Sequence, residues 1–439
     1  MTDADRTLPP RLDGPLPGTT GHLVVRQPAD EQLDLYRAAV DATYGSPFHA
    51  MSEQEARDWD ELIPPRNRSV VVEQGPEGVE RVLGGAGRYD TALSLPGGGR
   101  VPVAGLTAVG VAPGAQHRGA FRALIEAHLD ECRARGDAAS VLMASQTPLY
   151  GRFGYGLATR AATWEIDSPA ARALAAGAPT AGSVVLEHGR GPELIEALHG
   201  VWEQAGARRA GSLTRSPAWW ERMLSRKKTW VGGGDLLVAL HHTPAGALGG
   251  YALYEVDIDQ GRQGLAEADI TISEMVGVDV AVELDLWRFL ADLPWARTLR
   301  WAYAPIDPAA LFWLDDPRQL RRMADLDFLW LRPLDLQALT ESRTFATDGS
   351  VVLEVSDPRY AELAGRFELR VASGHGTWAP TDRAAGLSLS VADLGSLWLG
   401  GASARQLVAV RRISGDPAAA GLLDAMLAVD GPPRCVARF

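Results

Sequence analysis

A segment near residue 110 combines the residue types that can hold a phosphate group. It reads VGVAPGAQHRGAF over 109–121, between a strand-like alternation and an amphipathic run. A strand, a turn containing Gly119 and a helix are therefore expected in that order. A helix N-terminus offers unpaired N–H groups and the positive end of the dipole, which both suit a pyrophosphate. The segment lacks the GK[ST] of a Walker A loop and is not a GxGxxG loop, so an ordinary strand-to-helix turn stays open.

The elements that must hold this loop are indicated by hydrophobic periodicity. A strand-like run at 22–27 precedes an amphipathic helical pattern at 30–45, and a second helix is expected around Trp59. Further strands are expected at 69–74, 81–90, 105–112 and 140–145, with a helix at 121–136. This order is typical of a mixed sheet with helices, an α/β arrangement.

A second α/β pattern begins near residue 183 and repeats the order of the first. MVGVD at 275–279 corresponds to AVGVA at 108–112, which indicates a weak internal repeat. Glu283 and Asp285 then stand where the first copy has 116–120. Carboxylates at a helix N-terminus suit its dipole and repel a phosphate. We therefore expect the second loop to be degenerate.

The remaining chain divides into a tail and a third region. The start is rich in proline and glycine, and another Pro/Ala/Gly-rich segment near 170 is a plausible boundary. Strand-like runs after 335 suggest a small α+β domain with a hydrophobic interior and no catalytic cluster. The expected units are a flexible tail at 1–20, a first unit at 21–170, a second at 183–334 and a third at 335–439.

Composition excludes several classes of function. The net charge of −12 disfavours binding to nucleic acid. Two cysteines, Cys132 and Cys435, without clustered histidines give neither a disulfide framework nor a metal site. No signal peptide and no apolar run of about 18 residues is present, so no membrane segment is expected. A cytoplasmic location fits best.

Longer segments extend this pattern to a family resemblance. The chain resembles the enhanced intracellular survival (Eis) acetyltransferases in five segments and in its terminal phenylalanine. The segments are AGLTAVGVAP, YGRFGYG, YALYEVD, VVLEVSD and PTDRAAGLSLSVADLGSLWLGG. The loop is similar to the [Q/R]xxGx[G/A] loop of Gcn5-related N-acetyltransferases (GNAT), with Phe121 where a small residue is usual. The resemblance implies two tandem GNAT folds, only the first catalytic, then a sterol carrier protein-like domain, and a hexamer.

The resemblance also implies which residues hold acetyl-CoA. Val109 and Val111 would offer strand backbone to the pantetheine arm, and Ser145 would lie near the thioester. The pyrophosphate would be held by Gln116, His117, Arg118, Gly119 and Ala120. Related sequences tend to have arginines in place of Gln116 and His117, which predicts weaker CoA binding.

The same resemblance assigns catalytic roles. Tyr150 would be the general acid, and Tyr155 is a competing candidate in the same loop. The α-carboxylate of Phe439 would be the general base, which requires a buried chain end. Arg438 replaces an expected acidic residue, which puts binding of polycations in doubt. Trp59 would line the amine pocket, although a helix-core role fits it nearly as well.

The implied activity is transfer of acetyl from acetyl-CoA to a primary amine. Aminoglycosides, acetylated at one or several positions, are the first substrate hypothesis, and lysine side chains are the second. An alternative of another class is an acyl-CoA or lipid-binding protein. In that case the interior of 335–439 would be the functional site and the first loop would be vestigial.

Overall fold

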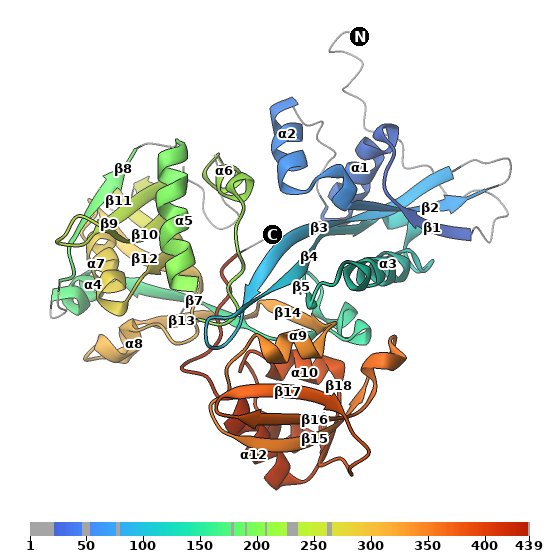
Figure 1. Cartoon of the computed structure of the whole chain (residues 1–439). Coiled ribbons are helices and arrows are strands. Elements are labelled where there is room, and N and C mark those ends of the chain that lie inside the picture. The colour runs from blue at the N-terminus through green and yellow to red at the C-terminus, as the bar shows by residue number, and fades with distance from the viewer. Residues whose placement is uncertain are drawn as a thin grey trace.

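The computed structural model has three β-sheets, each covered by helices (Figure 1). It describes residues 22–45, 53–75, 80–176, 180–188, 191–206, 209–225, 236–260 and 266–437. Two sheets have seven strands each and the third has five. The mixed α/β class predicted from the sequence is confirmed. None of the helices in the described ranges is both long and apolar enough to cross a membrane.

The first sheet carries the predicted phosphate loop. Its strand order is β1-β2-β3-β4-β5-β14-β6. The strands are β1 (His22–Arg26), β2 (Arg68–Gln74), β3 (Glu80–Ser94), β4 (Arg100–Val111), β5 (Ala139–Met143), β6 (Gly156–Leu157) and β14 (Leu329–Pro333). The helices are α1 (Leu33–Thr43), α2 (Glu53–Leu62) and α3 (Ala120–Arg135). The loop therefore connects β4 to α3, as predicted.

Strand alternation places α1 and α3 on opposite faces of this sheet. Val70 and Val72 of β2 pack in one cluster with Tyr36 of α1, whereas Val71 packs in another with Leu124 of α3. Helix α1 lies so close that a Cβ on Gly85 would come within 2.0 Å of the Tyr36 ring. Glycine on β3 thus permits the approach of α1 to the strands that carry the site.

The second sheet repeats this plan. Its order is β13-β7-β12-β11-β10-β9-β8. The strands are β7 (Arg160–Asp167), β8 (Ser183–Glu187), β9 (Leu237–His242), β10 (Leu248–Gln260), β11 (Ala266–Gly277), β12 (Ala296–Ala304) and β13 (Arg321–Asp327). The helices are α4 (Ser168–Ala176), α5 (Pro192–Gly206), α6 (Pro217–Ser225), α7 (Val280–Ala291) and α8 (Ala310–Trp313). β11, α7 and β12 correspond to β4, α3 and β5.

The first two sheets exchange strands, which the sequence did not indicate. β7 lies within the range assigned to the first unit, but it pairs with β12 and β13 of the second sheet. β14 lies within the range assigned to the second unit, but it pairs with β5 and β6 of the first. The two units therefore interlock, and no single chain position separates the two sheets.

The third sheet belongs to the C-terminal region and has the order β17-β16-β15-β18-β19. Its strands are β15 (Gly349–Ser356), β16 (Gly365–Ala372), β17 (His375–Pro380), β18 (Leu387–Ser390) and β19 (Ser414–Gly415). Its helices are α9 (Leu336–Glu341), α10 (Val391–Leu397), α11 (Ala404–Ala409) and α12 (Pro417–Leu427). Every residue of α10 is buried, and α10 contacts β14 and β6 of the first sheet.

A buried ion pair joins the third region to the first sheet. Arg332 of β14 and Asp357, just after β15, are 2.6 Å apart between Nη2 and Oδ2, and both side chains are fully buried. Arg332 also donates from Nε to the carbonyl oxygen of Phe153 at 2.8 Å. Because the loop after β5 contains Phe153, this pair holds that loop against the third region.

We predict that Asp357→Asn destabilises the protein by about 3–5 kcal/mol, because it leaves the buried Arg332 guanidinium without its counter-charge. Urea unfolding followed by tryptophan fluorescence measures this as an earlier transition. Asp382→Asn, at an exposed position, is the matched control and leaves the transition in place. An unchanged transition for Asp357→Asn would contradict the structural role of the pair.

Candidate active site

β4 and β5 pair over three residues and then separate. The parallel pairing runs from Val103–Ala139 to Gly105–Val141. The register between β3 and β4 then shifts, and Ala108 has a positive φ of 49°. A β-bulge of this kind bends a strand and redirects its edge. The end of β4 is therefore available to an extended partner on the side of β5.

The backbone groups of Val109 and Val111, which were predicted to contact pantetheine, face this free edge. The N–H of Ala112 donates to Leu83 of β3, so the backbone groups of Val111 point the opposite way by strand alternation. The carbonyl oxygen of Val111 accepts from Thr43 Oγ1 at 3.0 Å, and that of Val109 accepts from Tyr44 Oη at 3.4 Å. The end of α1 thus already contacts the edge that we assigned to pantetheine.

The loop after β4 presents unpaired donors. His117 and Gly119 have positive φ values of 62° and 89°, and Gly119 is the N-cap of α3 without a capping side chain. The N–H groups of 120–122 have no hydrogen-bond acceptor in the described part of the chain. The first-turn N–H groups of a helix attract an anion when no side chain caps them. Gln116 and His117 are exposed beside them.

Two arginines add positive charge near this helix start. Arg118 forms an ion pair with the buried carboxylate of Glu73, while its Nη1 is buried without a partner. Arg81 is the cross-strand neighbour of Glu73, and its Nε and Nη1 are likewise buried without partners. Two cations against one carboxylate leave an excess positive charge. The first-turn N–H groups and the two arginines fit a pyrophosphate. Arg81 was not identified from the sequence, because it lies far from residues 116–120 in the chain.

Tyr150 lies in the middle of the loop between β5 and β6. Its ring contacts Phe121 of α3 edge-on, with ring centres 5.6 Å apart. Phe121 departs from the GNAT loop pattern, and here it packs against the predicted general acid. The Tyr150 hydroxyl has no hydrogen-bond partner among the described residues. Burial, with a small contribution from Tyr44, raises the pKa of Tyr150 to about 12, so the phenol is neutral at pH 7.

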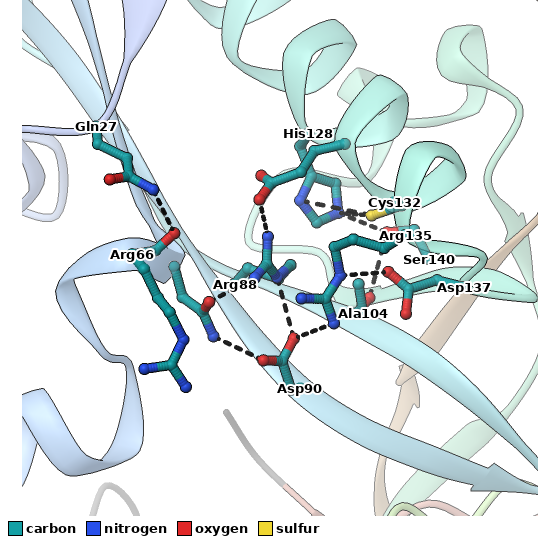
Figure 2. A network of polar contacts seen from close by, with 12 residues as sticks. Gln27, Arg66, Arg88, Asp90, Ala104, His128, Cys132, Arg135, Asp137 and Ser140 are labelled. Atoms are coloured by element: carbon teal, nitrogen blue, oxygen red, sulfur yellow. Dashed lines mark hydrogen bonds and ion pairs between the residues drawn. The ribbon is translucent and has the colours of Figure 1, made fainter.

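Tyr155 is arranged differently. It is fully buried, and its hydroxyl lies 2.7 Å from Ser140 Oγ, which lies 2.8 Å from His128 Nε2. Figure 2 shows His128 in contact with both Cys132 and Ser140, near the polar cluster of Arg88 and Asp90. Burial lowers the pKa of His128 to about 3, so this chain of groups is neutral. The Tyr155 hydroxyl is thus engaged inside the core.

Trp59 and Ser145 lie on different elements. Trp59 of α2 is half-buried with its Nε1 unpaired, and its ring centre is 5.0 Å from the guanidinium carbon of Arg222 on α6. α2 and α6 lie next to each other and are in contact (Figure 1). Ser145 is exposed just after β5.

The chain end is described up to Ala437. Phe439, the predicted base, and Arg438 lie outside the described residues. Cys435 and Ala437 are buried, and the N–H of Arg434 donates to Ala210 at 2.8 Å. The last described residues therefore run through the interior and form no free tail.

The second unit lacks the donor set of the first. Asp279 is the N-cap of α7, and its side chain accepts from the N–H of Val282 at 3.0 Å. Glu283 follows in the first turn, as predicted. Asp285 was predicted at the helix start, but it turns inward and accepts from the N–H of Ala181 at 2.7 Å. The helix is capped by its own carboxylates, which leaves no place for a phosphate.

Comparisons with known proteins give a consistent result. Two models of an acetyltransferase (GNAT) domain match residues 24–158 and 211–332, and a sterol carrier protein domain matches 336–436. The N-acetyltransferase Eis of Mycobacterium tuberculosis is 34% identical over 88% of this chain and 92% of that protein. An uncharacterized N-acetyltransferase of Streptomyces avermitilis is 29% identical over 93% of this chain and 96% of its own length.

Solved structures extend the likeness to the whole fold. Eis1 from Mycobacterium abscessus has a TM-score of 0.79 and 26% identity, and the match covers 95% of this chain and all of that one. A GCN5-related N-acetyltransferase from Anabaena variabilis has the same TM-score at 22% identity. With two GNAT domains, a sterol carrier protein-like domain and relatives above 30% identity over most of its length, the chain belongs to the Eis family of N-acetyltransferases.

Proposed function

We propose that this acetyltransferase moves acetyl directly from acetyl-CoA to a primary amine in its first GNAT domain. One observation carries the proposal. The uncapped start of α3, the free edge of β4 and the unpaired hydroxyl of Tyr150 occur at the same end of one sheet. An anion site, a backbone edge and a proton donor are what a thioester of CoA requires.

For acetyl-CoA, the proposed contacts follow the geometry of β4 and the loop. Val109 and Val111 hold the pantetheine arm through their backbone, with Ser145 near the thioester. The pyrophosphate is held by Gln116, His117, Arg118, Gly119 and Ala120. Arg81 adds a buried positive charge next to Glu73, the ion-pair partner of Arg118. Because Arg118 is already paired with Glu73, the first-turn N–H groups supply most of the binding.

In the proposed transfer, the amine nitrogen attacks the acetyl carbon, the C–N bond forms and the C–S bond breaks. Tyr150 donates its proton to the leaving thiolate. Its raised pKa keeps the phenol protonated until the thiolate forms. Tyr155 is the weaker candidate, because its hydroxyl is hydrogen-bonded to Ser140 in the core.

The proton lost by the amine is accepted, in this proposal, by the α-carboxylate of Phe439 through a water molecule. The buried course of the chain up to Ala437 supports a terminus inside the protein. A carboxylate in such a place is a stronger base than one in water, because burial disfavours its charged form.

The acceptor in this proposal is a cationic amine. We propose an aminoglycoside, acetylated at one or more amines, and place a lysine side chain second. The net charge of −12 favours a cationic substrate in both cases, and Trp59 offers an aromatic face to it. We further propose a cytoplasmic hexamer, in line with the resemblance of the chain.

Binding of a lipid or an acyl-CoA by the third domain is not favoured. Its central helix α10 is buried between β14, β6 and the third sheet. The side chains of Leu397 at its end and of Trp398 and Leu399 just after it are fully buried. They belong to a core that is packed with apolar side chains of this domain.

The first experiment is thiol release from acetyl-CoA by the untagged protein with aminoglycosides, polyamines and lysine peptides, with mass spectrometry of the products. We expect release with at least one aminoglycoside, and products in which an acetyl group has replaced one hydrogen on each acylated amine. CoA binding without release for any amine would contradict this substrate class.

Tyr150→Phe is expected to lower kcat about 10²-fold or more, because general acid catalysis typically contributes 10²–10⁴-fold. The KM for acetyl-CoA is expected to stay within about twofold, since the ring and its contact with Phe121 remain. Steady-state thiol release measures both constants. Tyr254→Phe, a buried tyrosine of the second domain, is the control. Undiminished turnover of Tyr150→Phe would exclude Tyr150 as the acid.

A two-residue extension after Phe439 is expected to abolish transfer, because it moves the α-carboxylate by about 7 Å at roughly 3.4 Å per residue. Acetyl-CoA binding, followed by calorimetry, should be retained. The same two residues added at the N-terminus serve as the control. Full activity of the C-terminally extended protein would refute a catalytic chain end.

A further inference from the structure

The second GNAT domain has the same strand separation as the first. β11 and β12 pair in parallel up to Ile272 and Trp301, while β11 continues to Gly277. The register between β10 and β11 shifts near Ser273. α7 begins directly beyond this edge. In the first domain, the corresponding place is the proposed site of acetyl-CoA.

In the second domain, the C-terminal segment of the chain reaches this place. Arg434 donates from Nη2 to the carbonyl oxygen of Met275 on β11 at 3.0 Å. Its Nη1 lies 3.6 Å from Oε1 of Glu283 in the first turn of α7. Its guanidinium carbon is 5.5 Å from the ring centre of Trp301 on β12. One side chain thus contacts β11, α7 and β12.

Arg434 and Glu283 form a pair of opposite charges. A carboxylate near the start of α7 is stabilised by the helix dipole, and Arg434 supplies its counter-charge. Burial raises the pKa of Glu283, and the nearby Arg434 opposes that rise. Both side chains are only about one-sixth exposed, at 16% for Arg434 and 17% for Glu283. The contact is therefore shielded from most solvent screening.

The same residues line a cavity of about 250 Å³. Arg434 and Val436 form one side of it, and Glu283 and Val276 form part of another. A hydrogen bond from the Arg434 N–H to Ala210 fixes the backbone at the start of this stretch. From Arg434, five residues lead to Phe439, a reach of at most about 17 Å.

We propose that the degenerate second domain holds the chain end, with Glu283 and the edge of β11 clamping Arg434. Arg434 is then a positioning residue, because it sets where the α-carboxylate of Phe439 can lie. This inference rests on the proposed role of Phe439 as the base. In this arrangement the second domain binds the C-terminal segment of its own chain at the place where the first domain would bind a phosphate.

The test compares Arg434→Met, Arg434→Lys and Glu283→Gln in the full chain. Carboxypeptidase digestion followed by mass spectrometry, and hydrogen exchange of 435–437, report tail release without reference to activity. We expect digestion at least about tenfold faster in Arg434→Met, because opening of the segment exposes the terminus. In Arg434→Met, kcat should also fall at least about tenfold with an unchanged KM for acetyl-CoA. Arg434→Lys should partly restore both the slow digestion and kcat.

Arg370→Met, which removes an exposed arginine of β16, is the matched control. Unchanged digestion and exchange in Arg434→Met would overturn the clamp. Faster digestion with unchanged kcat would overturn the positioning role. In that case the C-terminal extension identifies the cause, because a harmless extension would show that the proposed base is wrong, and a harmful one that only the positioning role of Arg434 is wrong.

Discussion

The separation of β4 from β5 after three paired residues is the constraint on which the site depends. Parallel strands leave their carboxyl ends at one edge of a sheet, and the elements that follow both strands meet there. β4 leads into α3, and β5 leads into the loop of Tyr150. Because the pairing stops at Gly105, backbone groups, helix N–H groups and the phenol share one side of the sheet. A longer pairing would close the edge that the first domain offers.

The loop of Tyr150 depends on distant parts of the chain. β14 lies between β5 and β6 and so fixes both ends of this loop. Close backbone approach secures it further, because a Cβ on Gly156 would lie 1.8 Å from the carbonyl oxygen of Ala392 in α10. The ion pair of Arg332 and Asp357 completes the support. The third domain therefore supports the first sheet at the place where the proposed proton donor lies.

The sequence predicts local features of this molecule better than long-range ones. The strand, loop and helix over 105–136 were predicted correctly, since periodicity and glycine act within a few residues. The strand exchange was not predicted, because the pairings of β7 and β14 join strands that lie far apart in the sequence. Asp285 was misplaced, because its partner N–H at Ala181 is distant in sequence. The resemblance ranked Tyr150 above Tyr155 as the proposed acid, and the contact of Ser140 with the Tyr155 hydroxyl adds a physical reason that the sequence did not contain.

Strand exchange also explains why a GNAT domain without a phosphate site persists. β7 must cross to the second sheet before β14 can return to the first, so the first sheet cannot be completed without the second unit. The start of α3 is uncapped, whereas the start of α7 is capped by Asp279, and this difference leaves the exchanged strands untouched. Glu283 in the first turn of α7 is the carboxylate that Arg434 contacts. In the proposed arrangement, the start of α7 therefore holds the chain end at the place where the start of α3 would hold a phosphate.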